Sequence, residues 1–355
     1  MELSLRGHTE PATAVSTPDE SAALAAADLV PDPDGVDDSA QRLTRLRRIA
    51  GRQEFWLDWT APIGLVFLLI LFGSIAPGFL SAVNINGVLA DAAIPIVMAT
   101  GTTFVIASAG IDLSLASTVA LCSALVGMTA QHGADTAEIC LVGVGTGLIV
   151  GLVNGTVIGW IRIPDFIVTL GSLGIAEGLA LLVSDGKPVV INNQLFAYLA
   201  TRSVWLLRYE VLLALAVALV LHVILAWTRS GVHLLAAGGN RQATKALGIS
   251  NARMKLLAYA VSGLGAGLAA VMLTAYVGST QPSPDTDSLL LAIAAVVLGG
   301  ANLFGGRARI FGTLIGAILL TTLQDGLTFL GISAYYQPIL IGVIVVGSAV
   351  AMRTQ

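Results

Sequence analysis

Long apolar runs separated by short polar breaks dominate the chain after residue 58. They lie at about 59–76, 88–108, 113–130, 138–160, 165–183, 209–227, 255–277, 289–303, 310–330 and 335–351. Most approach the ~20 residues that an α-helix needs to cross the hydrocarbon of a bilayer. Only 11% of the residues are charged, whereas soluble domains carry roughly a quarter. The sequence therefore predicts an all-α, polytopic membrane protein of about ten helices, and not a β-barrel of short alternating strands.

Charge predicts the sides of the membrane, because Lys and Arg near membrane segments are retained in the cytoplasm. A basic cluster precedes the first run: Arg42, Arg45, Arg47, Arg48 and Arg52. The other basic markers of the same side are Arg162, the 228–255 loop, Arg307, Arg309 and Arg353. The acidic breaks 131–136 and 281–287 fall opposite, so an even number of crossings puts both termini in the cytoplasm. Lys187, Arg202 and Arg208, in the longest outer loop, fit this pattern least.

The first 50 residues are expected to be a disordered cytoplasmic tail that ends in the basic cluster. Its first 40 residues are rich in Ala, Asp, Pro, Ser and Thr and nearly free of aromatics, so folding would bury too little apolar surface to offset the ordering entropy. The tail lacks the basic start and apolar core of a signal peptide. Residues 51–355 are then the membrane domain.

Two runs are unusual for membrane-spanning helices. Run 88–108 contains Pro95, and run 289–303 is shorter than the ~20 residues of a typical span. Each could be a half-helix, within 88–117 and 289–306, because a bilayer tolerates irregular backbone only where protein or water satisfies it.

Glycines recur at four-residue spacing in the fourth run: Gly143, Gly147, Gly151, Gly155 and Gly159. Four residues are slightly more than one helical turn, so these positions form a groove where another helix can approach closely. The pairs Gly263/Gly267 and Gly312/Gly316 repeat the spacing. We expect these glycines to serve helix packing, with a gating role as the alternative.

The basic loop at 228–255 separates two runs that could each span a bilayer. It carries Arg229, Arg241, Lys245, Arg253 and Lys255. Within it, Asn240 suits the N-cap of a short helix at Arg241–Leu247 that Gly248 would end. A small helix held just outside the membrane, in a chain with no energy-converting site, indicates a docking element through which another protein moves the chain.

Several polar residues in or beside the runs are candidates for a translocation path or for structural bracing: Asp112, Ser114, Asn154, Glu177, Asn302, Gln324 and Asp325. A carboxylate at the bilayer centre costs at least ~2.5–3.5 kcal/mol on insertion scales. Asp112 lies in a break, where we expect it to cap the next helix, the alternative being contact with substrate or a polar cavity. The breaks at 110–113 and 300–303 share the pattern Gly-x-Asp/Asn-Leu, which is compatible with an internal duplication.

Glu177 and Asp325 have no Lys or Arg beside them in the sequence. A proton-coupled carrier could use either as its titrating carboxylate. Hydrogen bonding along an aqueous path, or a position near the interface, explains them without proton coupling, and we favour these two interpretations. Asp91 and Asp165 lie near the ends of runs and are expected at the interface.

No enzyme active site assembles in the sequence. The histidines are scattered: His8, His132, His222 and His233. Cys122 and Cys140 fall inside apolar runs and are expected to be small core residues. The pair 186–187 resembles the end of a phosphate-binding loop, but Leu181 replaces its first glycine and Pro188 its Ser or Thr. We therefore expect no catalysis, no metal or cofactor in this chain, and no nucleic-acid partner.

Four stretches carry a family resemblance, in order and at characteristic spacing. They are residues 79–85 (Phe-Leu-Ser-Ala-Val-Asn-Ile), 109–117 (Ala-Gly-Ile-Asp-Leu-Ser-Leu-Ala-Ser), 237–244 with 248–249, and 294–314. The second is close to the pattern Gly-Ile-Asp-Leu-Ser-Val-Gly-Ser. Together, over about residue 55 to the end, they resemble the permease subunit of a ribose/xylose/galactose-type bacterial ABC sugar importer, in the branched-chain amino-acid/sugar permease superfamily.

This resemblance implies a multi-pass protein of the bacterial cytoplasmic (inner) membrane that forms the path for uptake of a monosaccharide or related polyol. Its implied partners are a cytoplasmic ABC ATPase subunit, an extracytoplasmic sugar-binding protein, a second copy or paralogue of the permease, and membrane lipid. The ATPase would dock on Gly238, Gly239, Asn240, Arg241, Ala243, Thr244, Gly248 and Ile249. The chain departs from its relatives at Arg241, where Glu is frequent, and at Ala116, where Gly is usual.

Three alternatives stay open from the sequence. A branched-chain amino-acid ABC permease belongs to the same wider family. A proton-coupled secondary carrier would need no ATPase and would depend on Glu177 or Asp325. A membrane scaffold without transport would show no uptake phenotype on deletion.

Overall fold

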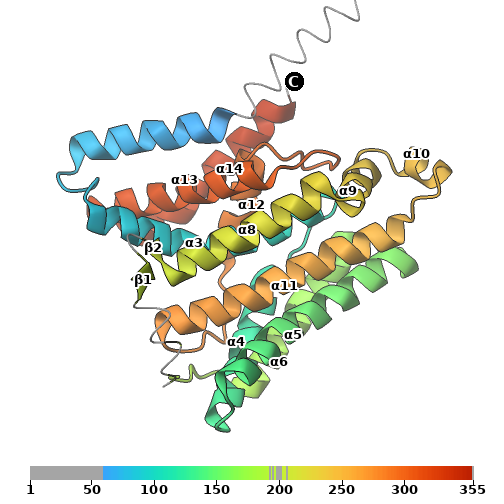
Figure 1. Cartoon of the computed structure of the whole chain (residues 1–355), viewed down its shortest axis with the longest axis horizontal. Coiled ribbons are helices and arrows are strands. Elements are labelled where there is room, and N and C mark those ends of the chain that lie inside the picture. The colour runs from blue at the N-terminus through green and yellow to red at the C-terminus, as the bar shows by residue number, and fades with distance from the viewer. Residues whose placement is uncertain (1–58, 192, 194–195, 197–201, 205–206, 354–355) are drawn as a thin grey trace, which may run out of the picture. The chain divides into compact units, whose positions relative to one another are not determined.

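The computed structural model describes residues 59–353, except 192, 194–195, 197–201 and 205–206. Its elements in chain order are a first helix Trp59–Ile75, α3 (Ala82–Ala107), α4 (Leu115–Gln131), α5 (Thr136–Thr156), the π-helix η1 (Val157–Ile161), α6 (Asp165–Ser184), β1 (Ser203–Val204), β2 (Leu207–Arg208), α8 (Tyr209–Trp227), α9 (Arg229–Gly239), α10 (Arg241–Ala246), α11 (Asn251–Val277), α12 (Thr286–Leu298), α13 (Ile310–Phe329), the 3₁₀ helix η2 (Ala334–Tyr336) and α14 (Gln337–Arg353). Helices dominate the described chain, and β1 and β2 form a short antiparallel pair (Figure 1). The predicted tail, its basic cluster and His8 lie outside the described residues.

Six described helices are long and apolar enough to cross a membrane: α3, α5 with η1, α6, α8, α11 and α13. This confirms the predicted class, an all-α membrane protein. Each of the ten predicted runs coincides with a helix, but the first helix, α4, α12 and the apolar part of the last run are shorter than the six. The number of crossings and the sides of the two termini therefore stay predictions.

The half-helix that the sequence left possible within 88–117 is not observed. Helix α3 has 26 residues and continues through Pro95. It starts earlier than predicted, at Ala82, after the N-cap Ser81, whose hydroxyl accepts the amide of Asn84 at 3.3 Å. The missing hydrogen bond at the proline is tolerated because α8, α11, α12 and α13 pack around α3. By contrast α12 has 13 residues, which is compatible with the half-helix expected within 289–306.

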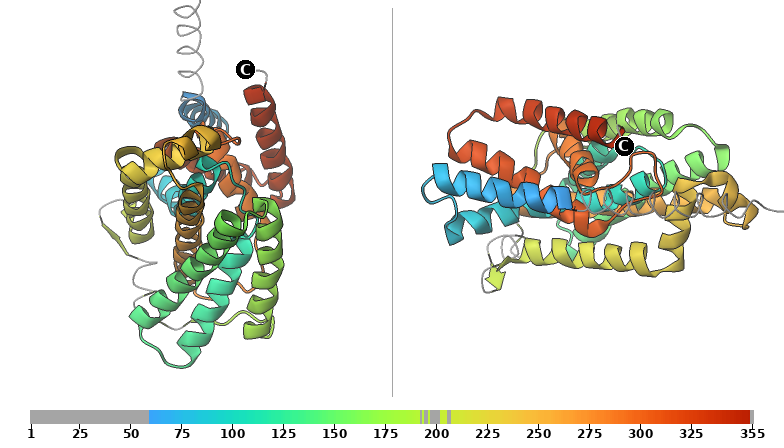
Figure 2. Two further views of the ribbon diagram at one scale, coloured as in Figure 1. Left: turned by 90° about the vertical axis from the view of Figure 1, so that its right-hand side faces the viewer. Right: turned by 90° about the horizontal axis from the view of Figure 1, so that it is seen from above.

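Helix α11 lies between α3 and α5 at the centre of the described bundle, as Figures 1 and 2 show. It begins before the predicted residue 255, because Ser250 caps it by accepting the amide of Arg253 at 3.4 Å. Its buried face is built mainly from Gly, Ala and Ser, with Tyr259 as the largest fully buried side chain. Cys122 is buried in α4, and Cys140 is partly buried in α5. Both are free thiols.

The evenly spaced glycines of α5 and η1 face α11 along their length. A methyl group built on Gly147 would lie 2.2 Å from the carbonyl oxygen of Gly263, and one on Gly151 would lie 2.2 Å from that of Tyr259. The contact is reciprocal, since a methyl group on Gly263 would lie 2.1 Å from the carbonyl oxygen of Gly147. The two backbones are therefore too close for any side chain between them, which is the geometry that small residues permit in membrane helices.

The other glycine pair of the sequence pattern joins α12 to α13. Methyl groups built on Gly312 and Gly316 would lie 2.0 Å and 2.3 Å from the carbonyl oxygens of Gly299 and Ala295. The short α12 is thus fixed against α13 by backbone contact.

Arg208, one of the three basic residues that fit the predicted sides of the membrane least, lies at the opposite end of the bundle from α10 and is paired with Glu210. Its Nε lies 3.0 Å from Oε1 of Glu210, and its guanidinium lies 5.4 Å from the ring centre of Tyr276. The Tyr276 hydroxyl in turn donates to Asp91 at 2.7 Å. Arg208 is therefore held by an acid and an aromatic ring in the folded bundle.

The close contact predicts that Gly147→Ala lowers the free energy of unfolding by about 1–3 kcal/mol, the usual cost of overpacking. Gly145→Ala is the matched control on the same helix, because a methyl group there meets nothing within 4 Å. It should be neutral or stabilising by up to about 1 kcal/mol. Thermal unfolding of the two purified variants in one detergent measures the difference. Equal midpoints would contradict the α5–α11 packing.

Candidate functional site

The short helix α10 protrudes between α9 and α11 (Figure 1). Asn240 caps it, because its side-chain oxygen accepts the amides of Gln242 at 3.1 Å and Ala243 at 2.9 Å. The helix ends at Ala246, one residue before the predicted end. Gly248 (φ 78°) then adopts the left-handed conformation, and the amide of Ile249 donates to Thr244 O at 3.0 Å, which closes the helix in a Schellman motif.

The residues expected to dock an ATPase separate into two groups. Arg241, Ala243 and Gly248 are exposed, and the neighbouring Leu247 is 78% exposed. Thr244 is buried beneath α10, where its hydroxyl bonds Asn251 at 3.3 Å and ties the helix to the start of α11. Only the first group offers a surface to a partner.

Gly238 belongs to the inside of the fold. A methyl group built on it would lie 1.9 Å from the carbonyl oxygen of Ala107 and 2.9 Å from the amide nitrogen of Gly306. That amide donates to the same Ala107 carbonyl at 3.0 Å. The end of α9 thus packs against two breaks between helices. The first break, 108–114, follows α3, and the second break, 299–309, follows α12. We call this contact of residues 107–110, 238–239 and 305–306 the break junction.

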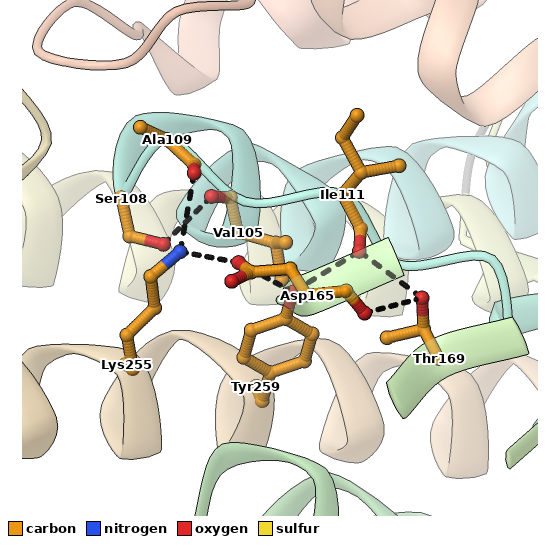
Figure 3. A network of polar contacts seen from close by, with 8 residues as sticks. All are labelled: Val105, Ser108, Ala109, Ile111, Asp165, Thr169, Lys255 and Tyr259. Carbon is orange, nitrogen blue, oxygen red and sulfur yellow. Dashed lines mark hydrogen bonds and ion pairs between the residues drawn. The ribbon is translucent and has the colours of Figure 1, made fainter. Parts of the chain in front are cut away.

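An ion pair lies beside the break junction, between Lys255 of α11 and Asp165 at the start of α6 (Figure 3). The two side chains are 8% and 16% exposed. The Tyr259 hydroxyl is 3.0 Å from the same Asp165 oxygen. The sequence interpretation treated Lys255 as a loop charge and Asp165 as an interfacial acid, and it did not predict that the two pair.

Lys255 and Tyr259 also donate hydrogen bonds to backbone carbonyls of the first break. The Lys255 ammonium donates to the carbonyl of Ala109 at 3.2 Å, and the Tyr259 hydroxyl donates to that of Ile111 at 3.0 Å. Thr169 of α6 adds a donor to Ile111 at 3.3 Å. Freed carbonyls in a membrane protein are tolerated when such partners exist, so α6 and α11 hold the break in one shape (Figure 3).

Asp112, in the same break, is also buried. Its carboxylate accepts the amide of Ser114 at 3.0 Å, the Ser114 hydroxyl at 2.7 Å and the Ser262 hydroxyl at 2.9 Å. Asn154 of α5 donates to the Ser114 hydroxyl at 3.0 Å and accepts from Ser172 of α6. Asp112, Ser114 and Asn154 therefore form one network that joins α5, α6 and α11 to the start of α4.

The second break repeats the local turn of the first. Asn302 accepts the amide of Phe304, two residues on, at 3.0 Å, as Asp112 accepts that of Ser114. Each preceding helix also closes with a bond over five residues, from Gly110 to Val105 and from Ala301 to Val296. Unlike Asp112, Asn302 is exposed.

The remaining polar candidates lie elsewhere in the fold. Asp325 is partly buried on α13 and accepts from Asn84 at 3.1 Å, while the backbone carbonyl of Gln324 accepts from Gln337 at 3.4 Å. Glu177 lies part-exposed on α6 and makes no hydrogen bond or ion pair with another residue of the described chain. None of the three joins the network at the breaks. Within the described ranges, no group of His, Cys, Asp and Glu side chains could hold a metal ion.

A cleft of about 750 Å³ opens beside the ion pair. Its walls are the first break, the end of η1 with the start of α6, the α9–α10 segment and the start of α11. It adjoins α10 at the end of the bundle where the two breaks meet.

Closely packed apolar spans, two buried helix breaks and a small exposed helix define a polytopic membrane permease. The family described as "Branched-chain amino acid transport system / permease component" matches residues 84–349, and the chain belongs to it. No solved structure matches the chain.

The chain is 36% identical to the ribose import permease protein of Bacillus subtilis (strain 168), over 80% of its own length and 88% of that protein. It is 32% identical to the D-allose transport system permease protein of Escherichia coli (strain K12), over 84% and 92% of the two chains. It is 31% identical to the autoinducer 2 import system permease protein of Yersinia pseudotuberculosis serotype O:1b (strain IP 31758), over 82% and 83%.

The sequence held a signal for the residues that were missed. Lys255, Tyr259 and Ser262 follow one another at four and three residues, so they share one face of α11. This polar stripe at the start of an apolar run indicates a buried polar contact. Its partners Asp112 and Asp165 are 150 and 90 residues away in the chain, and nothing local pairs them with it.

The ion pair predicts a strongly non-additive mutant cycle. Asp165→Asn leaves the Lys255 charge buried without a counter-ion, and Lys255→Gln does the same to Asp165. Each single variant should lose about 3–5 kcal/mol of stability, the usual cost of breaking a buried pair. The double variant removes both charges and should be more stable than either single variant. Thermal or urea unfolding measures the cycle, and additive losses would show that the pair is not buried.

Proposed function

We propose that this chain is the transmembrane permease subunit of a bacterial ABC importer that takes up a ribose-like monosaccharide or related polyol across the cytoplasmic membrane. A separate ATPase subunit supplies the energy and an extracytoplasmic binding protein delivers the substrate. The printed functions of the relatives, import of ribose, D-allose and autoinducer 2, support this class of substrate. The observation that carries the proposal is α10, a capped, exposed helix tied to the end of α9, which packs on the break junction, and to the start of α11.

The anchoring gives α10 the properties of a lever. Its first residue follows Asn240, whose own amide donates to Ala236 of α9 at 2.9 Å. On its buried side Thr244 and Arg241 are bonded to Asn251, the first residue of α11. A displacement of α10 therefore moves the end of α9 and the start of α11 together. Through these, the displacement reaches both helix breaks without passing through flexible chain.

The exposed surface around α10 suits a protein partner. Leu247 at its end and Phe304 in the second break are 78% and 81% exposed. Arg241 and Lys245 add positive charge beside them. Exposed apolar anchors rimmed by charge are typical of protein interfaces. In this proposal the ATPase covers Leu247 and Phe304, and its closure on ATP moves α10.

Ala243→Trp tests the lever. The residue is exposed on α10, so the variant should fold, insert and keep its thermal midpoint while co-purification with the ATPase falls by about tenfold, equivalent to ~1.4 kcal/mol. Sugar uptake and permease-stimulated ATP hydrolysis should fall with it. Ala236→Trp, at an exposed position of α9, is the matched control and should keep all three. Normal uptake by a well-expressed Ala243→Trp variant would reject the assignment of α10.

A branched-chain amino acid is the second candidate substrate, because the description of the family names that transport system. Calorimetry on the binding protein encoded beside the permease separates the two. Heat of binding with a monosaccharide supports the first candidate, and heat with leucine or valine supports the second.

A third arrangement, a proton-coupled carrier, makes a different prediction for Glu177. Glu177→Gln should preserve substrate uptake at every external pH if ATP drives transport. Vesicles that contain the permease alone should not accumulate substrate under an imposed proton gradient, and adding the ATPase, ATP and the binding protein should restore accumulation. Accumulation by the permease alone, abolished in Glu177→Gln, would overturn the ABC assignment.

A further inference from the structure

The cleft beside α10 carries more positive charge than the fold uses. Its lining includes the cations Arg162, Arg241, Lys245 and Lys255 and the single acid Asp165. Asp165 is engaged by Lys255. Within the described part of the chain, the other three cations have no acidic partner.

Unpaired cations that share one concave surface repel one another, and an anion placed among them removes that repulsion. The cleft has room for such a group, since its volume is about 750 Å³. The backbone contributes too: Pro164 and Asp165, at the N-terminal end of α6, line the cleft, and the partial positive charge at a helix N-terminus favours an anion. The shape and the charge both suit a phosphate group.

An apolar surface leads away from the same cleft. Trp160 and Ile161 of η1 and Phe166 of α6 are each more than half exposed, at 51%, 64% and 53%. They flank Arg162, which directly follows the membrane-span candidate Thr136–Ile161. Tryptophan at the end of a span, next to arginine, is typical of the level of lipid headgroups.

We propose that this cleft binds the phosphate of an anionic phospholipid, with Arg162, Arg241 and Lys245 around the headgroup. The acyl chains then lie on the surface of Trp160 and Phe166. Basic pockets between membrane helices on the cytoplasmic side are known to hold such headgroups. An acidic segment of a partner protein would match the charge but would leave the aromatic flank uncovered, and free phosphate would do the same.

The site would link lipid to the working part of the permease. Arg241 and Lys245 belong to α10, Arg162 to the α5–α6 connection, and Lys255 to the ion pair that holds the first break. A bound headgroup bridges α10 to α6. It therefore stabilises the present arrangement of α10 relative to α6.

Native mass spectrometry of the purified full-length chain tests the proposal. The chain is equilibrated with equal mole fractions of phosphatidylglycerol and phosphatidylcholine, and the retained lipids are counted. The native chain should retain phosphatidylglycerol with a preference of roughly a hundredfold, because three headgroup-contacting cations contribute about 1 kcal/mol each. The variant Arg162→Gln/Lys245→Gln should lose most of this preference. The control Arg229→Gln/Arg253→Gln removes two exposed cations of the same loop that do not line the cleft and should keep it.

Four outcomes overturn the proposal. One is no preference for phosphatidylglycerol in the native chain, and another is equal loss in the cleft variant and the control. A third is displacement of the retained lipid by millimolar inorganic phosphate, which would assign the cleft to a free anion. The fourth is unchanged lipid retention in a cleft variant that no longer co-purifies with the ATPase, which would assign it to an acidic protein surface. Thermal midpoints establish that both variants fold; if the double variant does not, Arg162→Gln against Arg253→Gln carries the same comparison.

Discussion

The structure depends on satisfying the backbone where helices break inside an apolar protein. Hydrocarbon offers no hydrogen bonds, so each carbonyl freed at a break must find a partner in the protein. The carbonyls of Ala107, Ala109 and Ile111 find theirs on three different elements: the second break, α6 and α11. A local requirement of seven residues thereby determines how distant parts of the chain assemble. The glycines at 238, 305 and 306 follow from it, because only backbone without side chains can approach so closely.

The break junction and the glycine contact have complementary mechanical roles. Along α5 and α11 the backbones touch, and such a pair moves as one body because no soft side chain lies between them. At the break junction the backbones also touch, at Gly238, Gly305 and Gly306, but the segments that meet there are short and are joined by single hydrogen bonds, with one ion pair beside them. Such contacts can be exchanged for others. Motion imposed on α10 will therefore concentrate at the breaks and leave the α5–α11 pair intact. This is the division between rigid bodies and hinges that switching proteins use.

The sequence predicted the helices better than the contacts between them. Apolar runs located the helices, and the chemistry of Asn240 and Gly248 located α10, since these signals are local. Pro95 misled because a proline ends an isolated helix, whereas in α3 the surrounding helices compensate for the lost bond. The pairing of Lys255 with Asp165 was missed for a different reason. An acid at the end of a run has the same sequence signature whether it faces water or a lysine from another helix, and only the fold decides between them.

The buried ion pair at the first break contributes more to specificity than to stability. Such a pair adds little net stability, because desolvation of both charges offsets their attraction. It does add specificity: Lys255 can reach Asp165 and the carbonyl of Ala109 together only when α6, α11 and the break are in register. If the start of α11 shifts, Lys255 loses both contacts at once. The free energy of these contacts is regained only when α11 moves back. A contact that is either fully made or fully broken separates two states by a definite free energy, which a partner that binds one state better can then overcome. The ion pair is therefore better suited to defining the two ends of a transport cycle than to stabilising the fold.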